Sequence, residues 1–124
     1  MLIKTYSSAV YGVDASTITV EINIDQGINF YLVGLPDSAI KESQHRIVAA
    51  LKNNNFRWPG FRITVNLAPA DIRKEGSAYD LPIAVGILAA SDQAFFPDLD
   101  SFIIVGELSL DGGLMPVNGV LAIA

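Results

Sequence analysis

The stretch from Ile63 to Ala90 constrains the fold of this chain more than any other part of the sequence. It opens with a strand-like run at residues 63–67, continues through a polar, turn-rich loop at residues 68–79, and closes with a nearly all-apolar run at residues 81–90. An apolar run of this length, bounded by turn residues, is typical of a buried helix. The order of strand, loop and buried helix therefore predicts polar groups beside the first turn of a core helix.

The expected start of this helix is marked by Asp80 and Pro82. Asp is a favoured N-cap residue, and Pro is tolerated in the first turn, where its missing N–H costs little. We therefore expect Asp80 to be the helix cap. Loops at such positions often bind anions or carry a nucleophile. The candidate contact residues on this loop are Asp71, Arg73, Lys74 and Ser77. The simpler alternative, which residue chemistry favours, is a solvated loop and a cap with no further role.

Composition and charge exclude several classes of protein. The chain has 124 residues, which suits one domain, or part of one, with a proper core. It has no cysteine, so disulfides and thiolate metal sites are excluded, and its single histidine, His45, is expected on the surface rather than on a metal. The net charge of −5 argues against a large nucleic-acid footprint. No apolar run reaches the roughly 18 residues of a membrane helix, and the N-terminus lacks the shape of a signal peptide, so we expect no membrane contact. The absence of cysteine fits a cytoplasmic protein.

Alternating polar and apolar residues predict strands in the first third of the chain. Residues 17–24 alternate over their whole length, which is the pattern of a half-buried strand. Two strands are expected at residues 2–10 and 16–24, and a third at residues 29–33. The turn residues between these segments predict an antiparallel meander.

A helix is expected to start at Asp37 or Ser38, either of which is a suitable cap, and to stop at the three asparagines of residues 53–55. Its apolar residues recur at helical spacing. Glu42 and Arg46 are four residues apart, which predicts an ion pair on the exposed face of the helix.

The last quarter of the chain predicts a strand followed by a hairpin. Residues 102–106 have the composition of a buried strand, and Asp111-Gly112-Gly113 is a strong hairpin turn signal before a return strand at residues 114–117. Residues 120–124 resemble the first turns of an apolar helix and have no stop signal. Because a natural C-terminus is rarely so apolar, we expect the chain to be cut from a longer protein.

Three blocks of sequence motifs are specific when they are taken together. The first is Gly34-Leu35-Pro36-Asp37 with Ile40-Lys41-Glu42-Ser43 and Arg46; the second is residues 63–71 with Lys74-Glu75-Gly76 and Asp80-Leu81-Pro82-Ile83-Ala84; the third is residues 106–112 with Pro116-Val117, Gly119 and Val120. With these blocks the chain resembles, over nearly its whole length, the N-terminal domain of the magnesium-chelatase-like AAA+ ATPases, the ComM/YifB family.

The resemblance implies an α/β (α+β) fold, with a mixed sheet and helices packed on it, that is shared by the Lon proteolytic domain and a small-subunit ribosomal protein domain. In the family this domain precedes an AAA+ ATPase module, which is therefore expected beyond residue 124. Family members of the ComM type are hexameric helicases that drive branch migration of DNA during natural transformation. The implied partners are the chain's own AAA+ module, the neighbouring subunits of a hexamer and, through the full-length protein, DNA.

No phosphate-binding motif of the type G-x-x-x-x-G-K-[ST] occurs in the 124 residues, so the chain has no P-loop. We therefore expect no cofactor and no metal in this chain. The resemblance implies ATP and Mg for the ATPase module outside it.

A Lon-like fold also raises the alternative of a serine peptidase, which would use a Ser-Lys dyad. When Lys74-Glu75-Gly76 is aligned with the Lon motif K-D-G-P-S-A-G, Ala78 takes the place of the nucleophile, and Ser77 stands one residue early. Aligning the third block puts Leu121 in the place of the lysine. We expect Lys74 to lie on a polar loop without an apolar pocket, kept protonated by Asp80. A non-catalytic domain is therefore favoured, with no catalytic residue.

Overall fold

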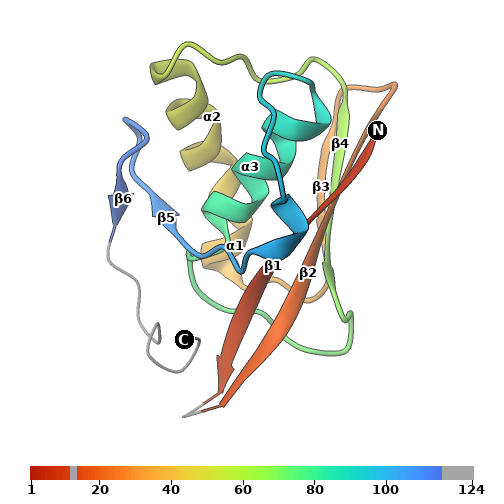
Figure 1. Ribbon diagram of the computed structural model, residues 1–124, viewed down its shortest axis with the longest axis vertical. Helices are drawn as coiled ribbons and strands as arrows, with labels where there is room; N and C mark the ends of the chain where they lie inside the picture. Colours follow the sequence, from red (N-terminus) through yellow and green to blue (C-terminus); the bar gives the residue numbers. More distant parts are fainter. Residues whose placement is uncertain (12–13, 116–124) are drawn as a thin grey trace.

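The computed structural model describes residues 1–11 and 14–115. Its main feature is a four-stranded sheet built from β1 (Leu2–Tyr11), β2 (Asp14–Asp25), β3 (Phe30–Val33) and β4 (Arg62–Ala68). The helices α1 (Ser38–Lys41), α2 (Ser43–Asn53) and α3 (Asp80–Ala90) lie together on one side of this sheet (Figure 1). The remaining elements are η1 (Leu99–Ser101) and a hairpin of β5 (Glu107–Leu108) and β6 (Leu114–Met115). This arrangement confirms the predicted α+β class with a mixed sheet.

The order of strands in the sheet is β1-β2-β4-β3, and this order corrects the predicted meander. β2 pairs antiparallel with β1 on one side and with β4 on the other, whereas β3 pairs parallel with β4. The strands themselves lie where alternation predicted them. Parallel neighbours need a long crossover, and α1 with α2 supplies it between β3 and β4. After the helices, β4 therefore inserts between β2 and β3 and separates two strands that are consecutive in sequence.

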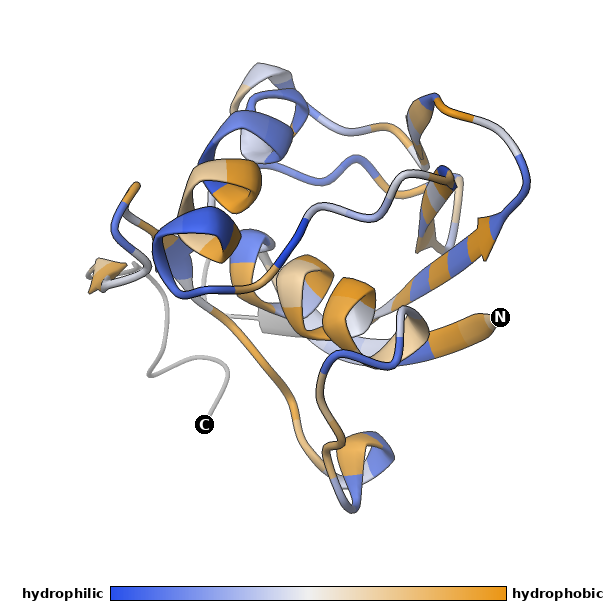
Figure 2. Ribbon diagram, turned by 90° about the horizontal axis from the view of Figure 1, so that it is seen from above, coloured by the Kyte–Doolittle hydropathy of each residue, from blue (hydrophilic) through white to orange (hydrophobic). Residues whose placement is uncertain are grey.

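The core forms where the inward residues of β2 and β4 meet the helices. Alternate side chains of each strand point to the same face, so every second residue is buried, and Figure 2 shows the resulting bands of contrasting hydropathy along the strands. The fully buried aliphatic residues are Ile18, Val20, Ile22, Ile40, Ile47, Ile63, Val65, Leu67, Ile83 and Ile87. At 25 cal/mol per Å², burial of such side chains contributes about 1.5–3 kcal/mol each relative to exposure.

The close approach of α3 to the sheet depends on Gly86. A Cβ atom at this position would lie 2.1 Å from Cδ1 of Ile22, on β2. α3 is otherwise apolar on nearly all sides, as predicted for a buried helix, and it begins one residue before the predicted run. Its first turn is fixed to β1, because the hydroxyl of Thr5 donates to the carbonyl of Pro82 at 3.0 Å.

Two further expectations are modified by the structure. The predicted single helix after Asp37 is split into α1 and α2 at Glu42, and it ends at the predicted asparagines. Residues 102–106, predicted to be a buried strand, are an extended segment with one isolated bridge, Tyr6 to Ile103, and the side chain of Phe102 is exposed. The hairpin after it is confirmed by β5 and β6, but the residues from Pro116 on, with the predicted apolar helix, lie outside the described residues.

No helix among the described residues is long and apolar enough to cross a membrane.

Candidate functional site

The loop between β4 and α3, residues 69–79, is fastened to the start of α1 by Asp37. One carboxylate oxygen of Asp37 accepts the N–H of Ile40 at 2.9 Å and caps α1, as predicted, while the other accepts the N–H of Gly76 at 2.9 Å. The backbone of Asp37 also donates to the carbonyl of Lys74, and the N–H of Lys74 donates to the carbonyl of Leu35. The loop is therefore held by backbone and side-chain bonds on the same short segment, and the sequence did not reveal this second role of Asp37.

The most buried ionic contact of the described residues joins Arg46 of α2 to Asp80 of α3. Nε of Arg46 lies 2.6 Å from Oδ2 of Asp80, and Nη2 lies 2.9 Å from Oδ1, so the contact is bidentate. Oδ2 also accepts the N–H of Leu108, on β5, at 3.1 Å, and Nη2 donates to the carbonyl of Ala39 at 2.7 Å. The carboxylate of Asp80 is 0% exposed and the Arg46 side chain is 20% exposed. The pair therefore connects both helices to the C-terminal hairpin.

This contact corrects two expectations. Asp80 is not the N-cap of α3: Tyr79 occupies that position, and Asp80 is the first helical residue, with its carboxylate directed to Arg46 and Leu108. Arg46 does not form the predicted exposed pair with Glu42, because its guanidinium group turns toward the buried carboxylate instead. A bidentate guanidinium–carboxylate contact is stronger and more specific than an exposed pair at helical spacing, and this difference explains the outcome.

Burial and pairing act in opposite directions on Asp80. Burial raises the pKa of its carboxyl group, while the hydrogen bonds from Arg46 and from the N–H of Leu108 lower it. The same carboxylate raises the pKa of Arg46 through their hydrogen bonds. Burial is already the larger influence, and removing the guanidinium group would raise the pKa of Asp80 further, so Arg46 is the main group that stabilises the charged form of this carboxylate.

Lys74 does not lie on the surface of the loop, contrary to expectation. Its side chain is fully buried, and Nζ donates to the carbonyl of Pro69. Burial lowers the pKa of its ammonium group, and the nearby charge of Asp71 opposes that shift. Asp80 does not hold it protonated, because the carboxylate of Asp80 is occupied by Arg46. The sequence did not reveal the burial, because no apolar run surrounds Lys74; the loop covers it only in three dimensions.

The hydroxyl of Ser77 is bonded to Glu107 rather than to Lys74. It donates to Oε1 of Glu107, the first residue of β5. Among the described residues no hydrogen bond joins Ser77 to Lys74, and Nζ of Lys74 is bonded to the carbonyl of Pro69. Ala78, in the place of the Lon nucleophile, contributes only its backbone carbonyl, which accepts the N–H of Gly106 at 2.8 Å. Leu121, in the place of the Lon lysine, lies outside the described residues.

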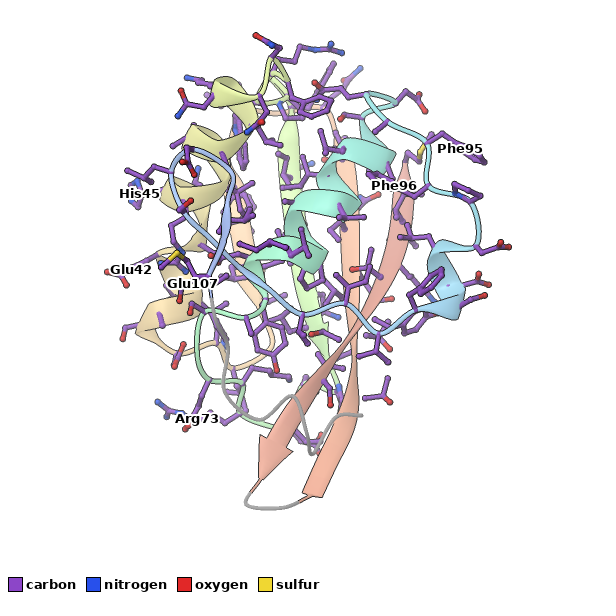
Figure 3. All side chains as sticks on the ribbon, turned by 60° about the vertical axis from the view of Figure 1, so that its left-hand side comes forward. Glu42, His45, Arg73, Phe95, Phe96 and Glu107 are labelled. Atoms are coloured by element: carbon purple, nitrogen blue, oxygen red, sulfur yellow. The ribbon has the colours of Figure 1, made fainter. Side chains whose placement is uncertain are left out.

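The exposed part of the loop is carried by Asp71, Arg73 and Glu75. Nε of Arg73 lies 3.4 Å from Oε1 of Glu75, and both side chains are about 70% exposed, at 69% and 71%. Arg73 extends away from the body of the molecule in Figure 3. Of the four predicted contact residues, Asp71 and Arg73 therefore lie on the surface. The polar groups of Lys74 and Ser77 are instead used in hydrogen bonds within the protein, to Pro69 and Glu107. Glu75 joins the exposed set.

The loop does not fit a phosphate group, although it has the order strand, loop, helix. The first residue of α3 is the anionic Asp80, and the N–H of Leu81 is already bonded to the carbonyl of Gly106 at 3.0 Å. A phosphate at this helix end would meet a carboxylate in place of free N–H donors. Among the described residues there is also no cluster of three His, Cys, Asp or Glu side chains that would hold a metal ion. His45 is exposed on α2, as predicted.

Comparisons with known proteins agree with the resemblance read from the motifs. The family model described as subunit ChlI of Mg-chelatase matches residues 20–124. The competence protein ComM of Haemophilus influenzae is 52% identical over 117 residues, which cover 94% of this chain and 23% of that protein. The uncharacterised protein YifB of Escherichia coli is 45% identical over 120 residues, covering 96% and 24%, and an uncharacterised protein of Mycobacterium tuberculosis is 41% identical over 119 residues, covering 95% and 24%. The chain thus spans about a quarter of the length of these relatives. It belongs to the magnesium-chelatase-like AAA+ family of subunit ChlI, together with the ComM and YifB proteins.

Proposed function

We propose that this chain is a non-catalytic domain of a magnesium-chelatase-like AAA+ ATPase that acts as a ComM-type helicase and promotes branch migration of DNA in natural transformation. Its partners are its own AAA+ module and the neighbouring subunits of a cytoplasmic hexamer, and DNA is bound by the assembled protein. ATP and Mg²⁺ belong to the ATPase module. The similarity to the competence protein of Haemophilus influenzae supports this proposal.

The observation that carries the non-catalytic role is the division of Ser77 and Lys74 between separate partners. A Lon-type dyad requires the lysine amine within hydrogen-bond reach of the serine hydroxyl. Here the hydroxyl of Ser77 donates to Glu107, and Nζ of Lys74 donates to a backbone carbonyl. The bond of Ser77 connects the loop to β5, and the bond of Lys74 connects two parts of the loop. Both groups therefore have a structural role.

The surface that this loop offers for contacts is its exposed end. Asp71, Arg73 and Glu75 are exposed, and Arg73 is the cation among them. Glu75 pairs with Arg73, and the chain carries a net charge of −5. This surface therefore suits contact with a neighbouring subunit or with a single phosphate group better than contact with many successive phosphates of DNA. The isolated chain should therefore bind DNA weakly and in a salt-dependent manner.

Branch migration by the longer protein tests this role. Arg73→Glu should reduce the rate at saturating ATP by about tenfold or less, because one exposed contact contributes modestly. Arg57→Glu, an equal charge change at another exposed position, is the matched control and should leave the rate unchanged. If both variants change the rate equally, or if Arg73→Glu leaves it unchanged, the loop is not a contact surface.

One observation favours the alternative of a Lon-like serine peptidase: Lys74 is buried and its pKa is lowered, as the base of a Ser-Lys dyad requires. Labelling of the longer protein with a serine-reactive fluorophosphonate separates the two proposals. We expect no labelling, and casein digestion in the presence of ATP should be absent. Stoichiometric labelling at Ser77 that is lost in Lys74→Met would establish the peptidase.

Nucleotide binding provides an independent test. Titration calorimetry of the 124-residue chain with ATP and Mg²⁺ should show no binding, since no P-loop is present. A dissociation constant below roughly 100 μM, which corresponds to more than about 5 kcal/mol, would contradict the assignment of ATP to the separate module.

A further inference from the structure

The extended segment of residues 102–105 carries an unused backbone edge. On its inner side the N–H of Ile104 donates to the carbonyl of Tyr6, on β1, at 2.7 Å. Successive residues of an extended chain direct their N–H and C=O groups to opposite sides, so those of Ile103 and Val105 point away from β1. Neither residue has a backbone hydrogen bond to another part of the chain that the structure describes.

This edge lacks the features by which proteins protect exposed strands. Residues 101–106, Ser-Phe-Ile-Ile-Val-Gly, contain no charge and no proline, although charged side chains, proline or a covering element normally block pairing at an edge. The side chains of Phe102 and Ile103 are 60% and 47% exposed. Both backbone and side chains are thus available to an additional strand.

An apolar pocket lies beside the edge. It has a volume of about 430 Å³ and is formed by α3, the residues before η1 and the edge itself. Its lining includes Leu81, Val85, Phe96, Leu99, Phe102 and Ile104. A second pocket of about 490 Å³ shares Phe96 and Leu99 and reaches Phe95, which is 87% exposed. Because alternate side chains of a strand point to one face, every second residue of an added strand would enter this apolar surface.

The charges around the edge select the partner. From Glu75 to the end, the sequence has seven acidic residues and no lysine, arginine or histidine. Asp98 and Asp100 are exposed at η1, immediately before the edge, and Asp92 borders the second pocket. A second copy of this chain would bring the same negative charge to the contact, which is unfavourable, whereas a basic segment would be attracted.

We propose that residues 102–105 bind an extended segment of a partner protein as an added β-strand, and that this segment has an apolar core and basic flanks. Backbone bonds to Ile103 and Val105 provide the attachment, the pocket receives alternate apolar side chains, and Asp98 and Asp100 contact the lysine or arginine residues of the flanks.

Peptide binding tests the proposal. The probe is a fluorescein-labelled peptide, Lys-Lys-Val-Thr-Val-Thr-Val-Lys-Lys, and the control peptide has glutamate in place of lysine. Fluorescence anisotropy with the 124-residue protein should show at least about tenfold tighter binding of the basic peptide at physiological salt. Hydrogen exchange should slow at the amides of Ile103 and Val105 on binding and stay unchanged at Ile104, whose N–H is already used.

Two charge variants locate the contact. Asp100→Lys should weaken binding of the basic peptide by about fivefold or more. Glu42→Lys changes the net charge equally, but Glu42 lies on the side of the molecule opposite Phe95 and Phe96 in Figure 3, so its effect should stay below about twofold. Phe102→Ser, an exposed position, should weaken the binding of both peptides.

Several results would overturn the proposal. They are equal binding of the two peptides, equal loss in Asp100→Lys and Glu42→Lys, and exchange protection outside residues 102–105. A concentration-dependent dimer in sedimentation that buries these amides would assign the edge to a second copy instead. Binding that appears only after residues 116–124 are deleted would assign it to the chain's own apolar end.

Discussion

The buried contact between Arg46 and Asp80 allows a quantitative prediction. Arg46→Met keeps a similar stem but removes two charge-assisted bonds, at 2.6 and 2.9 Å. Of the donors to the 0% exposed carboxylate of Asp80 in the described part of the chain, the N–H of Leu108 then remains. Breaking one side of a buried pair costs about 3–5 kcal/mol. Because the Arg46 side chain is 20% exposed and water can reach its place, we expect about 3 kcal/mol.

For a domain of this size, the loss corresponds to a fall in the melting temperature of about 12 °C, at about 4 °C per kcal/mol. Urea unfolding, followed by the fluorescence of the single tryptophan, Trp58, measures the free energy directly. Trp58 is suitable because its ring packs against Phe30, with ring centroids 5.7 Å apart.

The chain offers a matched control in Arg62→Met. Nε of Arg62 likewise contacts a carboxylate oxygen, Oδ1 of Asp25, at 2.9 Å, but both side chains are nearly half exposed. Its removal should leave the unfolding free energy unchanged within error. A second control is Arg46→Met combined with Asp80→Asn, which removes the buried charge but keeps an acceptor for the N–H of Leu108. The double variant should be more stable than Arg46→Met alone.

The pH dependence supplies a further check on the same contact. Burial raises the pKa of Asp80 above its unfolded value, and without Arg46 nothing as strong opposes that shift. A carboxyl group with a raised folded-state pKa favours the folded state below its unfolded pKa, and this contribution is lost as pH rises through the folded pKa. The destabilisation by Arg46→Met should therefore grow from about pH 4 upward. If the loss of unfolding free energy in Arg46→Met is independent of pH, or no larger than that in Arg62→Met, then Arg46 does not stabilise the charged form of a buried Asp80.

Three other predictions follow from single contacts. Gly86→Ala should cost about 1–3 kcal/mol of unfolding free energy despite the better helix propensity of alanine, because the new Cβ would lie 2.1 Å from Ile22 Cδ1. Thermal unfolding should show that Ile22→Val relieves much of this cost. If the losses of stability from the two substitutions are additive, there is no clash. Because burial lowers the pKa of Lys74, the unfolded state binds more protons in alkaline solution, so stability should rise between pH 7 and pH 10 more steeply in the wild type than in Lys74→Met. Urea titrations measure both slopes, Lys41→Met at an exposed position is the control, and parallel slopes would show that Lys74 is solvated. Ser77→Ala should cost about 1 kcal/mol through the lost bond to Glu107, whereas an unchanged midpoint would mean that this bond contributes nothing.

The sequence alone determined most of the local structure. Strict alternation at residues 17–24 specified β2, because side chains of period two bury one face of a sheet, and the apolar run at residues 81–90 specified α3. Asp37 was recognisable as a cap and the turn at residues 111–113 as a hairpin, since both depend on neighbours within a few residues. The motif blocks were sufficient to identify the family.

The tertiary structure decided which distant groups meet. Alternation is the same in parallel and antiparallel strands, so it could not show that β4 separates β2 from β3. Asp80 and Arg46 are 34 residues apart, and local spacing favoured a cap for one and an exposed pair for the other. Only the packing of α2 against α3 brings them together, and a bidentate contact out of water outweighs either local alternative. Lys74 looked exposed because its neighbours in sequence are polar, but the loop that carries it folds back over its amine, and burial depends on neighbours in space.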